Sequence, residues 1–270
     1  MRVAAIQMNS QDNKEKNIDK AEEMIGEAVS KGSKIVVLPE MFNFLGAEEQ
    51  QPANAEKIPG LTIKRLMKKA KSHGVYILCG SILEARQAGE RLFNTSVLVD
   101  PKGEIIAKYS KLHLFDVSMQ GEVVYQESAI VQPGSEISTV ETEFGHLGLS
   151  ICYDLRFPEL YRRLTVRGAR LIFIPAAFTL HTGKDHWEPL IRARAIENQV
   201  YVVAANQIGS YAPQGMNWGK SMVVDPWGTV LSKAPDKESV IFADIDYSYQ
   251  QEIREKLPSL RHRREDIFVL

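Results

Sequence analysis

Glu40, Lys111 and Cys152 each come at or just after the end of a short apolar run of the sequence. In open α/β folds, reacting groups collect at the carboxyl ends of strands, so these three residues are candidates for chemistry. Each residue type also has a commoner role. A cysteine in a strand is usually a small core hydrophobe, a glutamate after a strand is usually a solvated loop acid, and a lysine is usually a surface charge. The spacing alone does not decide between these roles.

The two cysteines of the chain, Cys79 and Cys152, differ in the sequence that follows them. Cys152 precedes the signals of a helix start: Asp154 is a candidate cap, Pro158 suits a first turn, and Glu159 favours the positive helix end. A helix N-terminus stabilises anions, and we therefore expect it to lower the pKa of the Cys152 thiol from its usual value of about 8.5. Cys79 lies inside an apolar run without a helix signal, so we expect a packed, unreactive thiol.

A cysteine nucleophile usually works with a histidine base. We consider His113, His146 and His186, and none of them has the sequence context of a papain-like or caspase-like protease. The sequence also contains no H-E-x-x-H, clustered Cys-His, P-loop or G-x-G-x-x-G motif. We therefore predict neither a metal site nor a bound cofactor.

Composition excludes several classes of protein. The chain has 270 residues, of which 44% are hydrophobic and 25% are charged, so it can bury a large core and is neither disordered nor collagen-like. Its 33 basic and 34 acidic residues give a formal net charge of -1, which argues against nucleic acid or an anionic membrane as a partner. Two cysteines are too few for a disulfide framework, and the N-terminus lacks a secretory apolar segment. We expect a cytoplasmic protein with no nucleic-acid or membrane partner.

Short apolar runs alternate along the chain with amphipathic stretches of helical length. The pattern predicts strands over 3–7, 35–38, 75–79, 94–99 and 104–109, and helices over about 18–29 and 61–73. A similar order follows, with strands over 147–151, 171–174 and 201–205, a helix over 158–167 and a second helix around Trp187, Leu190, Ile191 and Ala195. The sequence therefore predicts two halves of similar organisation.

A shared motif supports an internal repeat. Residues 96–108 and 221–233 both read S-x-x-V-D-P-x-G with a lysine five residues after the glycine, at a constant offset of 125 residues. Each motif predicts a hairpin, and two β-α-β-α-β-β-β halves fit two sheets that each have helices on one face. We predict an α/β fold, with one domain over residues 1–270 built as a four-layer α-β-β-α sandwich with an internal pseudo-twofold repeat. The alternative is a chance match of two common D-P-x-G turns.

Three segments together resemble the catalytic blocks of the nitrilase (carbon-nitrogen hydrolase) superfamily, in the order typical of that family. These segments cover residues 38–40, 109–114 and 148–159. The likeness extends from Val3 to about Pro258, essentially the whole chain. It implies the α-β-β-α sandwich of that superfamily, in agreement with the fold predicted from the repeat.

The resemblance implies catalytic roles for four residues. Cys152 would be the nucleophile that attacks an amide carbonyl, and Glu40 would take the thiol proton, protonate the leaving ammonia and later activate water. Lys111 would stabilise the oxyanion together with the backbone N–H of Tyr153. Glu127 matches a second family glutamate, which orients Lys111 and the attacking water. Without the resemblance, Glu127 would be equally well a plain loop acid.

The residues after the cysteine resemble the amidase branches of the superfamily, because Tyr153-Asp154 stands where nitrilases generally carry Trp-Glu. Four further segments resemble the omega-amidase and deaminated-glutathione amidase branch; they cover residues 111–117, 125–128, 177–183 and 186–199. Substrates of that branch are amides of short acids that retain a carboxylate. The resemblance thus implies hydrolysis of a small carboxylate-bearing amide.

The resemblance also indicates how the substrate is held. Arg156 resembles an arginine that binds a substrate carboxylate in related carbamoylases, and a guanidinium fork suits that role. Alternatively, Arg156 pairs with a local acid such as Asp154 or Glu159. We expect the pocket wall to include Tyr153 and four other aromatic residues, Phe42, Phe115, Tyr125 and Phe178. The segment over 118–121 departs from the Pro-Gly form often seen in the family.

Two other functions stay open at this point. The chain could hydrolyse an N-carbamoyl compound by the same mechanism, or it could be a non-catalytic interaction protein that keeps the fold. A symmetric homodimer is the family expectation, with the helix over 186–198 as a contact, although the apolar face of that helix could instead be core. The basic tail over 254–266 fits a solvated or subunit-contacting segment.

Overall fold

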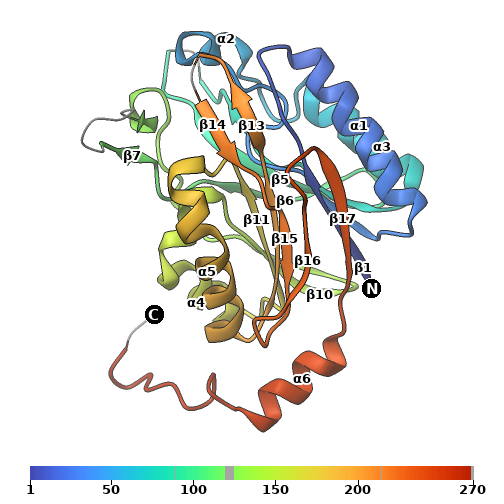
Figure 1. The fold of residues 1–270 in the computed structure, drawn as a ribbon, viewed down its shortest axis with the longest axis vertical. Coiled ribbons are helices and arrows are strands. Elements are labelled where there is room, and N and C mark those ends of the chain that lie inside the picture. The colour runs from blue at the N-terminus through green and yellow to red at the C-terminus, as the bar shows by residue number, and fades with distance from the viewer. Residues whose placement is uncertain (88, 119–124, 214, 269–270) are drawn as a thin grey trace.

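Two β-sheets form the centre of the fold, and helices lie on both sides of them (Figure 1). The computed structural model describes residues 1–87, 89–118, 125–213 and 215–268. The first sheet contains β1 (Arg2–Gln7), β2 (Ile35–Val37), β3 (Tyr76–Leu78), β4 (Ile82–Glu84), β5 (Phe93–Val99), β6 (Ile105–Ser110) and β17 (Ser239–Asp244). The second contains β9 (Thr139–Thr142), β10 (Gly145–Leu149), β11 (Leu171–Ala176), β12 (Tyr201–Asn206), β15 (Met222–Val224) and β16 (Val230–Lys233).

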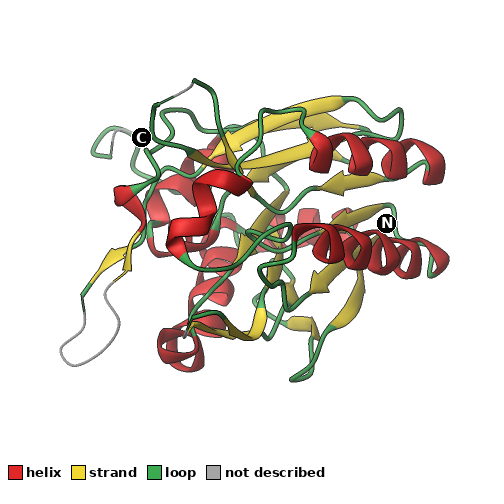
Figure 2. Ribbon diagram, turned by 90° about the horizontal axis from the view of Figure 1, so that it is seen from above, coloured by secondary structure: helices red, strands yellow, loops and turns green. Residues whose placement is uncertain are grey.

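Helices α1 (Lys14–Ser30) and α3 (Leu61–His73) lie on one side of the sheets, and α4 (Pro158–Val166) and α5 (Leu180–Asn198) lie on the other (Figure 1). Helix α6 (Tyr247–Lys256) follows β17. Two small hairpin sheets pair β7 (Asp116–Val117) with β8 (Tyr125–Gln126), and β13 (Ile208–Tyr211) with β14 (Gly215–Trp218). The short helices are η1 (Glu48–Gln50), α2 (Gln51–Asn54), η2 (Glu127–Ala129) and η3 (Cys152–Arg156). Figure 2 shows these elements from above.

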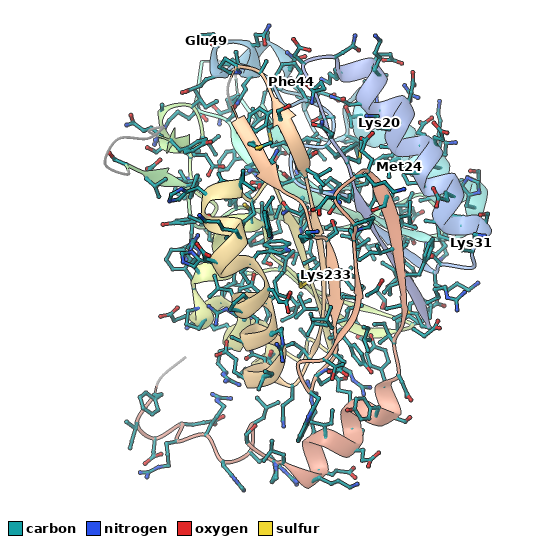
Figure 3. All side chains as sticks on the ribbon, viewed as in Figure 1. Lys20, Met24, Lys31, Phe44, Glu49 and Lys233 are labelled. Carbon is teal, nitrogen blue, oxygen red and sulfur yellow. The ribbon has the colours of Figure 1, made fainter. Side chains whose placement is uncertain are left out.

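Strand β1 shows how the layers form, because its side chains alternate between two separate cores. Ile6 packs in a core with Ile25 of α1 and Leu66 of α3. Ala5 faces the other way, into a core that also contains Leu149 of the second sheet. Side chains fill both interfaces (Figure 3). The two sheets therefore pack face to face with helices outside them, which confirms the predicted α-β-β-α sandwich.

The two predicted hairpins have the same geometry. In β5–β6, the Asp100 carboxylate accepts from the backbone N–H groups two and four residues later, at 3.0 and 2.8 Å. In β15–β16, Asp225 accepts the same two bonds, both at 2.8 Å. The strands around them also correspond: β1, β2 and β3 are parallel, as are β10, β11 and β12, and β5 and β15 run antiparallel to the last of each set. The internal repeat is confirmed, and a chance match of two turns is not the explanation.

Several elements were not predicted from the sequence. They include β9 and β17, which run antiparallel beside β10 and β1, the β13–β14 hairpin, and α6. Strands such as β9 and β13 are four residues long and partly exposed, so they carry little periodic signal. The predicted helix around Trp187 is α5, and Trp187, Ile191 and Ala195 on it are fully buried in the core. That apolar face is therefore core and does not form a subunit contact.

A glycine packs against the segment that carries Glu40. Gly80 follows β3 with a φ of +44°, and a Cβ atom at this position would lie 1.9 Å from the carbonyl oxygen of Pro39. Any other residue would displace the backbone at Pro39 or strain its own backbone. This contact fixes how the chain leaves β2, and with it the place of Glu40.

Candidate active site

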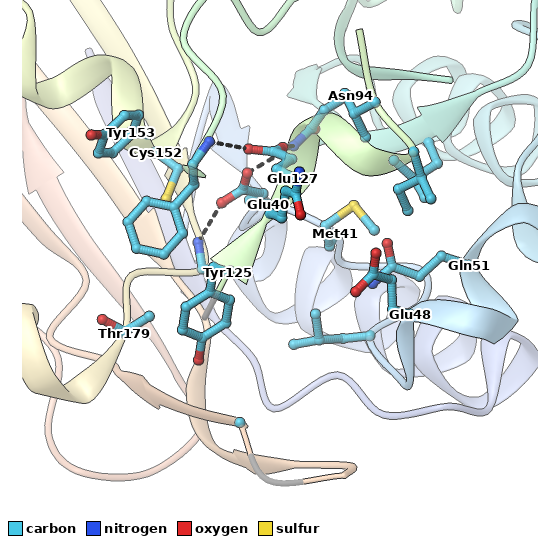
Figure 4. Close-up of a pocket in the computed structure, with 18 of the residues that line it drawn as sticks. Glu40, Met41, Glu48, Gln51, Asn94, Tyr125, Glu127, Cys152, Tyr153 and Thr179 are labelled. Carbon is cyan, nitrogen blue, oxygen red and sulfur yellow. Dashed lines mark hydrogen bonds between the residues drawn. The ribbon is translucent and has the colours of Figure 1, made fainter. Parts of the chain in front are cut away.

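Glu40, Lys111 and Cys152 meet at one edge of the two sheets, where they follow the ends of β2, β6 and β10. All three are nearly buried, with exposed fractions of 4%, 2% and 8%. Lys111 Nζ donates to Glu40 Oε1 at 3.0 Å. Figure 4 shows Glu40 and Cys152 in the wall of the same pocket. The structure thus brings together three residues that the sequence singled out separately.

Glu127 is the second carboxylate on Lys111. Its Oε2 and Oε1 atoms accept from Lys111 Nζ at 2.9 and 3.2 Å, and Oε2 also accepts from the backbone N–H of Phe115 at 2.7 Å. Asn94 links the two acids, because its Nδ2 atom donates to Glu40 Oε1 at 2.8 Å and to Glu127 Oε1 at 3.1 Å (Figure 4). The sequence prediction missed Asn94. The only signal was a polar amide at the start of an otherwise buried strand.

Atoms of the second sheet hold Glu40 in place. The backbone N–H of Ala177, just after β11, donates to Glu40 Oε2 at 2.8 Å. Gln207, just after β12, is fully buried, and its Nε2 atom donates to the backbone carbonyl of Glu40 at 3.0 Å. Glu40 is therefore fixed by both halves of the repeat, although it belongs to the first.

Backbone strain occurs at two positions of this site. Cys152 has a φ of 47° and Met41, directly after Glu40, has a φ of 54°. Residues with a side chain seldom adopt such angles, which cost roughly 1–3 kcal/mol each and tend to gather at functional sites. The helix predicted over 158–167 is α4, which begins at Pro158, whereas the short helix η3 that begins at Cys152 was not predicted.

The environment of the Cys152 thiol reverses the predicted direction of its pKa. Burial and the negative charge of Glu40 raise the pKa of Cys152 well above its usual range, against the lowering effect of Lys111. A five-residue helix supplies too little dipole to outweigh them. Burial disfavours the charge of Lys111, but Glu127 and Glu40 hold the pKa of its ammonium group well above the usual value. The site thus pairs a fixed cation with a thiol that keeps its proton.

The cavity has a volume of about 400 Å³. Its wall includes the predicted residues Tyr153, Phe115, Tyr125, Phe178 and Arg156. In Figure 4 it extends from Tyr153 and Thr179 at one end to Met41, Glu48 and Gln51 at the other.

The prediction for Phe42 was wrong. Its side chain is fully buried in the core between the first sheet and its helices, and it does not line the cavity. The turn after Glu40 directs this residue inward, while the adjacent Met41 lines the cavity. The unusual segment over 118–121 lies outside the described residues from 119 onward.

Arg156 lies at the cavity wall, with its guanidinium carbon 5.1 Å from the ring centre of Phe178. Its Nη1 atom is 3.2 Å from Nδ1 of His186. Within the described parts of the chain, it forms no ion pair with Asp154 or Glu159. The guanidinium is therefore available to a ligand in the cavity.

The described residues also bear on metal sites and membrane spans. Within them, no group of three or more histidine, cysteine, aspartate or glutamate side chains could hold a metal ion. No helix among these residues is long and apolar enough to cross a membrane.

Comparison with known proteins decides the family. The sequence model of the carbon-nitrogen hydrolase family matches residues 2–255. The chain belongs to the carbon-nitrogen hydrolase family. It is 42% identical to omega-amidase NIT2 of Homo sapiens over 269 residues, 100% of this chain and 97% of that protein. It is 44% identical to a deaminated glutathione amidase of Synechocystis sp. over 265 residues, 97% of each chain.

Solved structures of carbon-nitrogen hydrolases share the fold. Nit3 of Saccharomyces cerevisiae, a member of branch 10 of the nitrilase superfamily, has a TM-score of 0.89 at 31% identity, covering 98% of this chain and 96% of that one. A mutant amidase from Nesterenkonia sp. AN1 has a TM-score of 0.82 at 25% identity, covering 99% and 95%. That amidase carries the acetamide moiety of fluoroacetamide on its active-site cysteine. The resemblance to the superfamily is thus confirmed.

The raised pKa of Cys152 predicts how its alkylation depends on pH. Because the thiolate forms only above the usual thiol range, the rate of modification of Cys152 by iodoacetamide should still be rising above pH 9. Replacing Glu40→Gln removes a charge that raises this pKa, so the midpoint of the profile should move to lower pH. Mass spectrometry after timed alkylation gives the rate at each cysteine.

Cys79 is the internal control for this experiment. It is fully buried, and burial raises the pKa of its thiol, so it should stay unmodified while the protein is folded. A wild-type profile for Cys152 that levels off below pH 8 would contradict the prediction.

Proposed function

We propose that the chain hydrolyses a small amide that carries a carboxylate, and that it releases ammonia and a carboxylic acid through a thioester of Cys152. The observation that carries this proposal is the buried contact of Lys111 with two glutamates, in the wall of the cavity that Cys152 also lines. A nucleophile, a proton carrier and a fixed cation are the groups that acyl transfer from an amide needs. The family and its amidase members support the same reaction.

The first half of the reaction transfers the acyl group to the enzyme. Because the resting thiol keeps its proton, the proton moves to Glu40 as Cys152 Sγ attacks the carbonyl carbon. Lys111 and the backbone N–H of Tyr153 stabilise the oxyanion that forms. The carbon–nitrogen bond then breaks, Glu40 returns the proton to the nitrogen, and ammonia leaves.

The second half of the reaction releases the acid. Glu40 takes a proton from water, which attacks the thioester carbonyl, and Cys152 leaves as a thiol once it recovers the proton. Glu127 keeps Lys111 charged and oriented through both halves, since it bonds Lys111 Nζ and is itself fixed by the N–H of Phe115. Preorganisation of this kind keeps the cation in place when the oxyanion appears.

Arg156 supports the assignment of a carboxylate-bearing substrate. The guanidinium lies at the cavity wall beside aromatic rings and His186, and a guanidinium binds a carboxylate through two parallel hydrogen bonds. Glu40 and Glu127, at the reacting end, would repel an acid, so a substrate with a carboxylate should place that group toward Arg156. This orientation leaves the amide carbonyl beside Cys152.

Ammonia release tests the proposed reaction. Wild-type protein should release ammonia from at least one of 2-oxoglutaramate, succinamate and glutamine, or cleave deaminated glutathione. Cys152→Ala should lose at least about 1,000-fold in kcat/KM because it lacks the nucleophile. Cys79→Ala, which removes the other thiol from a core position, is the matched control and should keep the wild-type rate.

Three results would contradict the reaction. No turnover of any amide would support an interaction protein, and unchanged turnover by Cys152→Ala would exclude the thioester. Release of carbon dioxide with ammonia from N-carbamoyl compounds alone would move the assignment to a carbamoyl hydrolase.

The role of Arg156 gives a second prediction for substrate choice. Arg156→Met should raise KM for succinamate about 10- to 100-fold, since a charged hydrogen bond contributes roughly 1.5–3 kcal/mol. Turnover of butyramide, a neutral amide of the same length, should change little. Arg163→Met, on the exposed side of α4, is the control for loss of a surface charge. Equal losses on both substrates would show that Arg156 is structural.

We also propose a homodimer, in a reducing compartment such as the cytoplasm where the two free thiols persist. The supporting surface lies next to the outer side of α5. Ile196 and Trp227 are 48% and 59% exposed, and Ile196 contacts the turn that contains Gly228. Exposed apolar neighbours of this kind mark protein contacts.

Sedimentation velocity tests the dimer. The wild-type protein should sediment as a dimer at micromolar concentration, and Trp227→Glu should shift it toward monomer by placing a charge in the contact. Leu61→Glu, at an equally exposed position of α3, should leave the dimer intact. A monomeric wild type, or a dimeric Trp227→Glu, would refute this interface.

A further inference from the structure

Asp154 is a fully buried carboxylate that the reaction does not use. Its Oδ2 atom accepts from the Tyr109 hydroxyl at 2.7 Å and from the backbone N–H of Ile151 at 2.9 Å. Its Oδ1 atom accepts from the backbone N–H of His113 at 3.1 Å and lies 2.7 Å from His113 Nδ1. The four groups that contact Asp154 belong to two short segments of the chain, one around Lys111 and one around Cys152.

These two segments are the ones that carry the reacting groups. Tyr109 and His113 stand two residues before and two residues after Lys111, while Ile151 and Asp154 flank the start of the nucleophile turn. We propose that Asp154 is a positioning residue that fixes Lys111 relative to Cys152 across the two sheets. This inference rests on the proposed amidase function.

The bonding pattern requires a carboxylate. An ionised carboxylate only accepts hydrogen bonds and offers about four lone-pair sites, which matches donors from four directions. Burial and the neighbouring Asp154 raise the pKa of Tyr109 well above its usual range, so the phenol keeps its proton and donates it. In an asparagine at this position, the NH₂ group would face two of these donors, and it could not accept a hydrogen bond from either of them.

The backbone contacts of Lys111 do not reach the turn that carries Cys152. Its backbone N–H donates to Asn94 O and its carbonyl accepts from Gly134 N, both at 2.9 Å, and Asn94 belongs to the same sheet as Lys111. The bonds of Asp154 instead connect the Lys111 segment to the turn of the other sheet. His113 adds a stacked contact with Phe157, at 3.6 Å between ring centres.

The strained backbone makes the nucleophile dependent on this support. Cys152 has a φ of 47°, and the bond from Ile151 N to Asp154 closes the turn around it. A strained conformation persists only where its surroundings fix it. A displacement of about 1 Å between reacting groups can lower a rate roughly 100-fold.

Kinetics of Asp154→Asn test the proposal. We expect kcat to fall about 10- to 100-fold with KM within about threefold of wild type, because Arg156, the proposed carboxylate ligand, is retained. Tyr109→Phe removes one of the four bonds to Asp154 and should lower kcat about 3- to 10-fold. This second variant tests the proposal if Asp154→Asn does not fold. In the double variant the two effects should be less than additive, since both act through the same carboxylate.

Asp225→Asn is the matched control, because Asp225 is a nearly buried acid that accepts backbone N–H groups at the far end of β15. It should lower the melting temperature and leave kcat unchanged. The proposal would be overturned if kcat, expressed per titrated active site, stayed within twofold of wild type in Asp154→Asn or in Tyr109→Phe. It would also be overturned if the effects of the two substitutions on kcat were fully additive in the double variant.

Crystal structures of wild type and Asp154→Asn separate this proposal from the amidase assignment. A shift of Lys111 Nζ relative to Cys152 Sγ by more than about 0.5 Å is expected even if no amide is turned over. An unchanged separation would overturn the positioning role, whatever the substrate of the site.

Discussion

The ion cluster around Lys111 is the interaction on which the rest of the site depends. A nearly buried ammonium group is stable only when it is paired, and here Glu40 and Glu127 lie 3.0 and 2.9 Å from it. The same carboxylates hold the pKa of Lys111 well above its usual value, so the ammonium group keeps its charge at neutral pH. The lysine in turn offsets the negative charge that Glu40 places near Cys152. Cys152, Glu40 and Lys111 are therefore one electrostatic unit.

The repeated fold explains how these groups come to one point. Each half of the chain ends its parallel strands at the same edge, and the two sheets pack face to face there. Glu40 leaves the first sheet but is held by Ala177 and Gln207, which follow strands of the second. Asp154 makes the reverse connection, from the second half to the segment around Lys111. Neither half contains a complete site.

The features that could be predicted from the sequence are those that depend on neighbouring residues along the chain. Strand ends and the hairpin repeat depend on neighbours along the chain, and hydrophobic periodicity and turn motifs reveal them. The direction of the Cys152 pKa was wrong because burial and Glu40, which is remote in sequence, outweigh the local helix. Asn94 was missed for the same reason, since both of its carboxylate partners lie far along the chain. The prediction that Phe42 lines the cavity was wrong because the turn after Glu40 directs its side chain into the core. The adjacent Met41 lines the cavity instead.

Burial and strain at this site also bear on whether the chain is an enzyme. Replacing a buried ion cluster with apolar residues of similar volume is often neutral or stabilising, whereas removing one partner alone is strongly destabilising. Positive φ angles at Met41 and Cys152 add further strain that a glycine would relieve. A protein that used this fold only to bind partners would gain stability by losing these features. Their presence together, around a cavity of about 400 Å³, is the arrangement that a chemical reaction requires and that stability alone does not.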